Sequence, residues 1–435
     1  MTTARVLLWG RQIGAVTWAA ERATGVFQYT REFARSQIEI APLVMQLREA
    51  PYSFPELPYN SFHGLPGLLA DSLPDKFGHR LIDAWLTRQG LSHSDFSPVD
   101  RLCYIGSRGM GALEFEPAIE PAAQTAQPVD IAALVDLANW VLDQRAGVSG
   151  RLAGSDDQTS LRDLLRVGTS AGGARAKALL AWHPQTGEFR SGQLPAPDDF
   201  EPWLLKFDGI HNNRDHELAD PQGFGRIEYA YYRMASAAGI EMMPSRLHHE
   251  GGRSHFMTRR FDRDARGRKL HMQSLAGLCH FDYNQPGAYS YEQALAAMKR
   301  LQLDLPALEQ QYRRTVFNIL ARNQDDHVKN IAFLMDKQGR WSLSPAFDVT
   351  YAWNPSGDWT GRHQMTLQGK QDAFTLDDLI ACAEFAGIKK NRAMSVIDEV
   401  ADTIRQWPDF ADQAGVAVRD IERIGQAHRV MPAGR

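Results

Sequence analysis

The N-terminal part of the chain has short apolar runs before helical spacing takes over. The runs at residues 6–9 and 15–18 flank residues 10–14 and predict a small hairpin, and a third strand is expected at 26–29. From Phe62 to Leu86 the apolar residues recur three and four positions apart, which predicts helices. A strand-like run follows at 111–115. The pattern therefore indicates an α+β module over residues 1–116.

The composition changes after this module. Residues 117–130 are rich in Pro, Ala and Gln and predict a linker. Behind Asp130, a residue type that caps helix N-termini, the apolar spacing predicts a helix. The elements predicted next are strands at 178–182, 203–207 and 256–261, a helix at 226–239 and a turn at 248–252. Residues 131–263 are expected to form a second unit.

The rest of the chain is mostly helical. Apolar spacing predicts helices at 291–301, 308–321, 375–386 and 391–407. Between them lies the polar stretch 322–350, which crosses two short apolar runs. These runs predict a hairpin, with strands at 331–334 and 341–343 around a turn at 336–339. Residues 264–435 are therefore expected to form a mostly helical lobe.

Composition and charge are those of an ordinary globular protein. The chain has 435 residues, of which 43% are hydrophobic and 23% charged, and this length suits about two or three domains. The formal net charge of −4 gives no general attraction to DNA or to an anionic membrane. Cys103, Cys279 and Cys382 lack metal-ligand spacing, and no run approaches ~18 apolar residues. We therefore expect a cytoplasmic protein without membrane contact.

Candidate chemistry is concentrated in the polar stretch. Asp325 precedes Asn330 by five residues, and the predicted hairpin brings Asp348 near Asn330. A loop carboxylate, an amide and a second carboxylate are the groups that phosphoryl transfer uses. They predict Asp325 as the base for an attacking hydroxyl, and Asn330 with Asp348 as Mg²⁺ ligands. The alternative is that these side chains bond nearby backbone, as Asp and Asn often do in loops.

Two further features suit phosphate binding. Gly172 and Gly173 lie in a loop between apolar runs, where backbone N–H groups freed by glycine can hold phosphates, and Lys177 adds a cation. The loop lacks a Walker A sequence, and a plain turn is the alternative. Lys206 lies inside an apolar run and Glu228 opens the next helix, like the strand lysine and helix glutamate of kinases. A structural ion pair is the alternative for these two residues.

Other polar groups are expected to be structural. His63, His79 and His93 share no ligand spacing, so a surface or structural role is expected for them. Residues 259–263 carry four charges in five positions, which is typical of a solvated strand end. In a two-lobed kinase this is also the place where the lobes join and adenine docks. Residues 351–369 are rich in Gly and Trp, and we expect a loop near the active site.

Together these motifs resemble those of the HipA-like serine/threonine kinases, the toxins of bacterial type II toxin–antitoxin modules. The resemblance covers nearly the whole chain and rests on VGTSAGGARAKALL, WLLKFDG, RRFDR and HMQSLAGLCHFDYNQPGAYSYE. Its most specific parts are NQDDHVKN and the following LSPAFDVTY. It implies an α+β fold of the two-lobed protein-kinase type behind an N-terminal α+β module. Residues 131–263 would then be the N-lobe and residues 264–435 the helical C-lobe.

The resemblance also implies roles for single residues. It implies Asp325 as the catalytic base and Ser170 as a site of autophosphorylation that silences the enzyme. The nucleotide-binding residues that it implies are Gly172, Gly173, Lys177, Lys206, Phe261, His327, Lys329, Asn330 and Asp348. Two departures matter: Arg259 stands where some members have a carboxylate, and Asp326 lies next to Asp325. A small turn residue is the alternative reading of Ser170.

The same resemblance implies cofactors and partners. It implies ATP and Mg²⁺, a HipB-like helix-turn-helix antitoxin that binds operator DNA, and a protein substrate such as an aminoacyl-tRNA synthetase. DNA contact is then expected only through the antitoxin. Two other functions stay open. One is a kinase of small molecules, which shares the same base and metal geometry, and the other is a non-catalytic module that binds antitoxin or DNA.

Overall fold

The computed structural model describes most of the chain. Within residues 2–429 it leaves out 89, 93–95, 120–127, 145–174, 193–196, 211–222 and 265. Ser170, Gly172, Gly173 and His93 therefore lie outside the described residues, as does the middle of the predicted linker.

The sheet of the N-terminal module is built from strands along which buried and more exposed residues largely alternate. Its strands are β1 (Thr3–Leu8), β2 (Arg11–Ala19), β3 (Thr24–Tyr29) and β4 (Leu113–Glu116), antiparallel in the order β3-β2-β1-β4. The helices are α1 (Tyr59–Phe62), α2 (Gly67–Ala70), α3 (Lys76–Arg88) and α4 (Pro98–Ile105). The helical spacing predicted from Phe62 to Leu86 is thus divided among separate helices. Pro66 and Pro74 precede the second and third of them, since proline cannot continue a helix from within.

The described residues of the second unit form a five-stranded antiparallel sheet with two helices. Its elements are α5 (Ile131–Gln144), β5 (Lys177–Trp182), β6 (Phe189–Ser191), β7 (Glu201–Lys206), α7 (Phe224–Ala237), β8 (Ser245–Glu250) and β9 (Arg253–Arg259). The strand order is β6-β5-β7-β9-β8. The turn predicted at 248–252 is wrong in its first half, because His248 pairs with His255 in the β8–β9 ladder. The chain turns at Gly251 and Gly252, both of which have positive φ.

The C-terminal unit is mostly helical, as predicted. Its helices are α8 (Leu275–Cys279), α9 (Tyr291–Arg300), α10 (Leu305–Leu320), α11 (Leu376–Ala386), α12 (Lys390–Ile404), α13 (Trp407–Gln413) and α14 (Val418–Ala427). Its strands are β10 (His271–Ser274), β11 (Tyr289–Ser290), β12 (Ala332–Met335), β13 (Trp341–Leu343) and β14 (Met365–Thr366). The helix predicted to run to residue 407 stops at Ile404, and α13 and α14 follow it. No helix of the described residues is long and apolar enough to cross a membrane.

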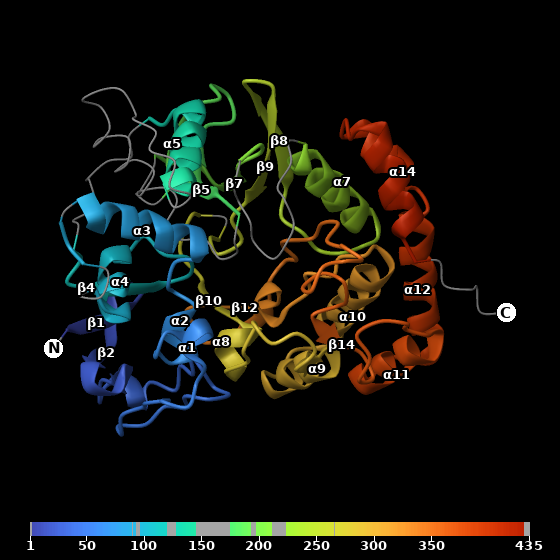
Figure 1. The fold of residues 1–435 in the computed structure, drawn as a ribbon. Helices are drawn as coiled ribbons and strands as arrows, with labels where there is room; N and C mark the ends of the chain where they lie inside the picture. The colour runs from blue at the N-terminus through green and yellow to red at the C-terminus, as the bar shows by residue number, and fades with distance from the viewer. Residues whose placement is uncertain are drawn as a thin grey trace.

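In the part of the chain that the structure describes, three buried apolar clusters hold these units together. One fills the C-terminal unit and includes α7, and a second lies under the N-terminal sheet and includes Met335 of β12. The third joins Phe77 and Leu81 of α3 to Leu180 and Leu205 of the five-stranded sheet. The N-terminal module therefore packs against both other units, and Figure 1 shows it beside them.

Candidate active site

A cavity of about 740 Å³ lies where the three units meet. Every predicted site residue that the structure describes lines it: Lys177, Lys206, Phe261, Asp325, His327, Lys329, Asn330 and Asp348. Residues from all three units contribute to the wall, including Ser61 and His63 of the N-terminal module. The fold thus brings together side chains that are far apart in the sequence.

Lys206 lies at the end of β7 and holds two acidic residues together. Its Nζ donates to Glu228 Oε1 at 2.5 Å and to Asp348 Oδ1. The Lys206 side chain is 9% exposed and that of Glu228 is 2% exposed. Burial alone would lower the pKa of Lys206, but Asp348 and Glu228 raise it above its ordinary value. Lys206 is therefore a fixed cation in the cavity wall, and Glu228 of α7 is its partner.

Asp348 follows the β12–β13 hairpin, as the spacing predicted. Its backbone is left-handed, with φ of 53°, a conformation that Asp adopts more readily than most residues. Burial raises the pKa of its carboxyl, but Lys206 and Lys177 outweigh that effect and lower the pKa to about 2. The side chain is 25% exposed, so a charged carboxylate is presented to the cavity at neutral pH.

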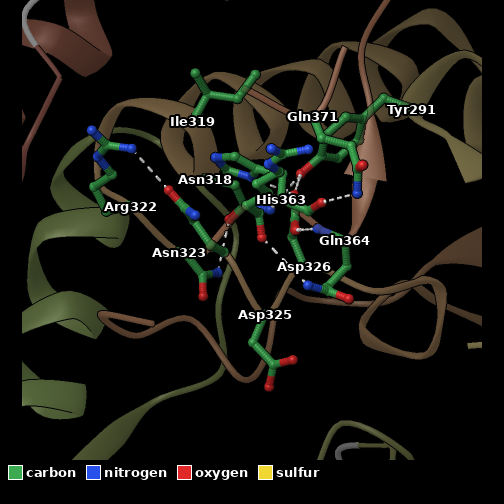
Figure 2. A network of polar contacts seen from close by, with 12 residues as sticks. Tyr291, Asn318, Ile319, Arg322, Asn323, Asp325, Asp326, His363, Gln364 and Gln371 are labelled. Atoms are coloured by element: carbon green, nitrogen blue, oxygen red, sulfur yellow. Dashed lines mark hydrogen bonds and ion pairs between the residues drawn. The ribbon is translucent and has the colours of Figure 1, made fainter. Parts of the chain in front are cut away.

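The side chain of Asn330 is hydrogen-bonded to the backbone of Asp325. Asn330 ends the short 3-10 helix η4 (Val328–Asn330), and its Nδ2 donates to the backbone carbonyl of Asp325 at 2.8 Å. This bond fixes the amide nitrogen, and among the described residues no hydrogen bond occupies the amide oxygen. The Asp325 side chain is 41% exposed, and its Oδ1 accepts a hydrogen bond from Trp359 Nε1 at 2.7 Å. In Figure 2 the Asp325 carboxylate points away from the neighbouring polar network.

Asp326 has the opposite environment. Its side chain is fully buried and accepts from Tyr291 OH, from His363 Nδ1 at 2.7 Å and from the backbone N–H of Gln364 at 2.7 Å. Burial raises the pKa of Asp326, but His363 and these hydrogen bonds lower it below its ordinary value. Figure 2 shows the network around it. Of the two adjacent carboxylates, only Asp325 lines the cavity.

The oxygen atoms present suit Mg²⁺. Asn330 offers an amide oxygen and Asp348 a carboxylate, and Mg²⁺ is usually held by one or two such protein ligands together with substrate phosphates. Among the described residues no group of three or more His, Cys, Asp or Glu side chains forms a metal cage. The pair therefore fits a cation that is shared with a nucleotide.

Lys177 faces the N-terminal module. It is paired in register with Lys206 across β5 and β7, and its Nζ lies 3.3 Å from Asp75 Oδ2. Both side chains are 3% exposed. Burial raises the pKa of Asp75 to about 6, against the opposing effect of Lys177. Asp75 was not a predicted site residue, because no local motif connects it to a lysine that lies in another unit.

Two histidines expected to be structural also lie in the wall. The ring centroids of His63 and His79 are 5.1 Å apart, and both residues line the cavity. Burial, Lys329 and Arg101 lower the pKa of His63 to about 4. Burial and Arg101 lower the pKa of His79 well below its ordinary value. Both rings are therefore neutral at pH 7.

The remaining predicted residues surround the same space. Phe261 lies against Phe347, with ring centroids 5.3 Å apart, and forms an apolar part of the wall. Arg259 Nη1 lies 3.7 Å from Glu201 Oε1, and its side chain is 36% exposed. The solvated strand end expected at residues 259–263 is otherwise wrong, because Asp262 is buried between Arg260 and Arg263 and forms ion pairs with both. Lys329 Nζ lies 4.6 Å from the centre of the Tyr283 ring.

Comparisons with family models and with solved structures point to the same protein family. The family model described as the HipA N-terminal domain matches residues 4–116, and that of the HipA-like C-terminal domain matches residues 169–407. A solved structure of HipA with HipB and operator DNA, a toxin–antitoxin system of Shewanella oneidensis MR-1, is similar over 98% of this chain and 94% of that one. The TM-score is 0.65 and the sequence identity 17%. The two-lobed α+β fold with an N-terminal module is thereby confirmed.

A relative in sequence is a putative kinase of Haemophilus influenzae. It is 28% identical over 134 residues, which are 28% of this chain and 39% of the relative. The match thus spans less than half of the length of that protein.

Proposed function

The chain belongs to the HipA-like family, and from this premise we propose that it is a serine/threonine protein kinase that uses ATP and Mg²⁺. One observation carries the proposal: a single cavity is lined by Asp325, Asn330, Asp348 and Lys206. A base, two oxygen ligands for a divalent cation and a buried lysine are the groups on which phosphoryl transfer depends.

Each of these residues has a role that follows from its surroundings. Asp325, exposed to the cavity, accepts the proton of the attacking hydroxyl as general base. Lys206 attracts the phosphates and is oriented by Glu228. Mg²⁺, when bound, neutralises charge on the phosphates of ATP. Asn330 and Asp348 would hold it through their side-chain oxygens.

We further propose that the kinase silences itself at Ser170. A phosphate on Ser170 adds nearly two negative charges to a loop that would hold the phosphates of ATP through Gly172 and Gly173. Repulsion between them would weaken the binding of ATP. Phosphate on Ser170 in the purified wild-type protein, found by mass spectrometry, would support this role, and full activity of that phosphorylated form would refute it.

The proposed partners are a HipB-like antitoxin and a protein substrate involved in translation, such as an aminoacyl-tRNA synthetase. The similar structure from Shewanella oneidensis MR-1 is a complex of HipA, HipB and operator DNA, which supports the first partner. The net charge of −4 favours DNA contact through that partner rather than by this chain alone.

The proposal is tested by substituting the base. Asp325→Asn should lower phosphate transfer from labelled ATP by at least about 10²-fold, because a general base contributes that much. The matched control is Asp336→Asn, an Asp in the β12–β13 turn outside the cavity, which should keep full activity. Label on protein rather than on small molecules separates a protein kinase from a small-molecule kinase. Undiminished transfer by Asp325→Asn would refute the assignment.

A further inference from the structure

One segment of the chain is wrapped around the loop that carries Asp325. The backbone N–H of Ala352 donates to the carbonyl of Arg322 at 3.1 Å, and that of Gln324 donates to the carbonyl of Ala352 at 3.2 Å. Gln324 Nε2 also donates to the carbonyl of Thr360 at 3.0 Å. Residues 352–364, which we call the wrapping segment, therefore follow the Asp325 loop along its length.

Two residues of the wrapping segment hydrogen-bond the buried carboxylate of Asp326. His363 Nδ1 and the backbone N–H of Gln364 both bond its carboxylate at 2.7 Å. With the Asp326 side chain held in the interior, the backbone that it shares with Asp325 is fixed as well. In Figure 2 the Asp325 side chain points away from the network around Asp326, and Asp325 lines the cavity.

The same segment reaches Asp325 through Trp359. The indole Nε1 donates to Asp325 Oδ1 at 2.7 Å, and His327 Nε2 lies 3.8 Å from the same oxygen. Among the described residues, these contacts to the carboxylate all end on Oδ1. A half-exposed carboxylate otherwise rotates freely, because its last torsion has no sharp minima. The indole contact selects one orientation and leaves Oδ2 open to the cavity.

We propose that Trp359 is a positioning residue that orients the carboxylate of Asp325 for proton transfer. An indole N–H only donates, so Trp359 holds the base without accepting the substrate proton in its place. A hydrogen bond to a charged carboxylate is also stronger than one between neutral groups. This inference rests on the proposed kinase function, since it gives Trp359 a role only if Asp325 is the base.

The kinetic test compares two tryptophans of the wrapping segment. Trp359→Phe keeps a ring and removes the donor, and we expect its kcat to fall roughly ten- to a hundredfold. KM for ATP and the midpoint of thermal unfolding should stay unchanged. The control is Trp353→Phe. Arg322 Cζ lies 4.4 Å from the centre of the Trp353 ring, and Trp353 does not line the cavity. Its kcat should be that of the wild type. An unchanged kcat in Trp359→Phe, or an equal loss in both variants, would overturn the proposal.

A second measurement separates this inference from the proposed function. In ¹⁵N-labelled protein the indole resonance of Trp359, assigned by its absence in Trp359→Phe, should move when Asp325→Ala removes the acceptor, and that of Trp353 should not. A Trp359 resonance that does not move would show that the contact is absent and would overturn the inference. If the wild-type chain transfers no phosphate, the proposed function fails and the role of Trp359 fails with it. If it does, and Trp359→Phe is fully active, the role of Trp359 alone fails.

Discussion

Two walls of the cavity differ in chemistry. The C-terminal wall, formed by Lys206, Asp325, Asn330 and Asp348, presents fixed charges and oxygen ligands. The N-terminal wall, formed by residues 59–61, 63, 70–76 and 79, presents the neutral rings of His63 and His79 and, at Asp75, an acid that is already paired. The first wall has the groups for phosphate and metal. The N-terminal wall encloses the space, and the charge of its Asp75 is already paired with Lys177.

The N-terminal wall also depends on contacts to both lobes. Asp75 reaches Lys177 of the sheet, and Asp71 accepts from the backbone N–H of Ser274 of the helical lobe at 2.7 Å. Gly67 donates its backbone N–H to His280 Nε2 at 3.1 Å. The module therefore bridges the two lobes across the cavity, and its position sets how far the walls stand apart. We therefore expect charge changes on the C-terminal wall to affect catalysis more than charge changes on the N-terminal wall.

The largest effect is expected from Lys206→Met. This change removes the cation that is shared by Glu228 and Asp348, and phosphate transfer should fall roughly 10²- to 10³-fold, as for other preorganised charges. On the opposite wall, Lys76→Met removes an exposed charge that lines the same cavity, and transfer should fall less than about threefold. Initial rates with labelled ATP measure both. Comparable losses in the two variants would erase the distinction between the walls.

A second contrast lies between two adjacent carboxylates, of which Asp325 belongs to the C-terminal wall and Asp326 is buried behind it. Asp326→Asn places an amide N–H₂ among three donors, Tyr291, His363 and the N–H of Gln364, so the free energy of unfolding should fall by about 3 kcal/mol. Asp325→Asn changes an exposed side chain and should stay within about 0.5 kcal/mol of the wild type. Urea unfolding at neutral pH measures both values. Equal stabilities would mean that the buried network contributes little.

The C-terminal wall could be predicted largely from the sequence. Asp325 and Asn330 lie five residues apart in one loop, and a short hairpin links them to Asp348, so local geometry determines their meeting. Lys206 and Glu228 lie on β7 and α7, which are only 22 residues apart at these positions, and their pairing also follows from local order. The assignment of roles to these residues stays a prediction, since the fold places them together without testing their chemistry.

The N-terminal wall could not be predicted in this way. Asp75 and Lys177 are more than a hundred residues apart, and their pairing depends on how α3 packs on the five-stranded sheet. The same is true of His63, which has no ligand spacing to any residue that it meets. Trp359 was expected near the site from composition alone, and only the fold shows that its indole reaches Asp325. Packing between units leaves no periodic signal in either segment.

The smallest effect concerns the pH response of the N-terminal wall. The folded protein binds a proton at His63 only below about pH 4, because burial, Lys329 and Arg101 lower its pKa. The unfolded chain binds that proton below its ordinary pKa of about 6.5. The unfolded state therefore holds more protons within this window, and stability falls as the pH drops from 6.5 to about 4. For His63 the loss at pH 5 should be about 2 kcal/mol.

His63→Asn should remove this part of the acid response. Residue 63 has a left-handed backbone, with φ of 52°, which Asn tolerates well. The loss of unfolding free energy between pH 7 and pH 5 should be about 2 kcal/mol smaller than in the wild type, and any constant cost of the substitution cancels in that difference. The control, Asp348→Asn on the opposite wall, should leave this window unchanged, because Asp348 has a pKa of about 2 and its contribution is lost only below its ordinary pKa. An equal loss in the wild type and His63→Asn would place the acid response elsewhere in the molecule.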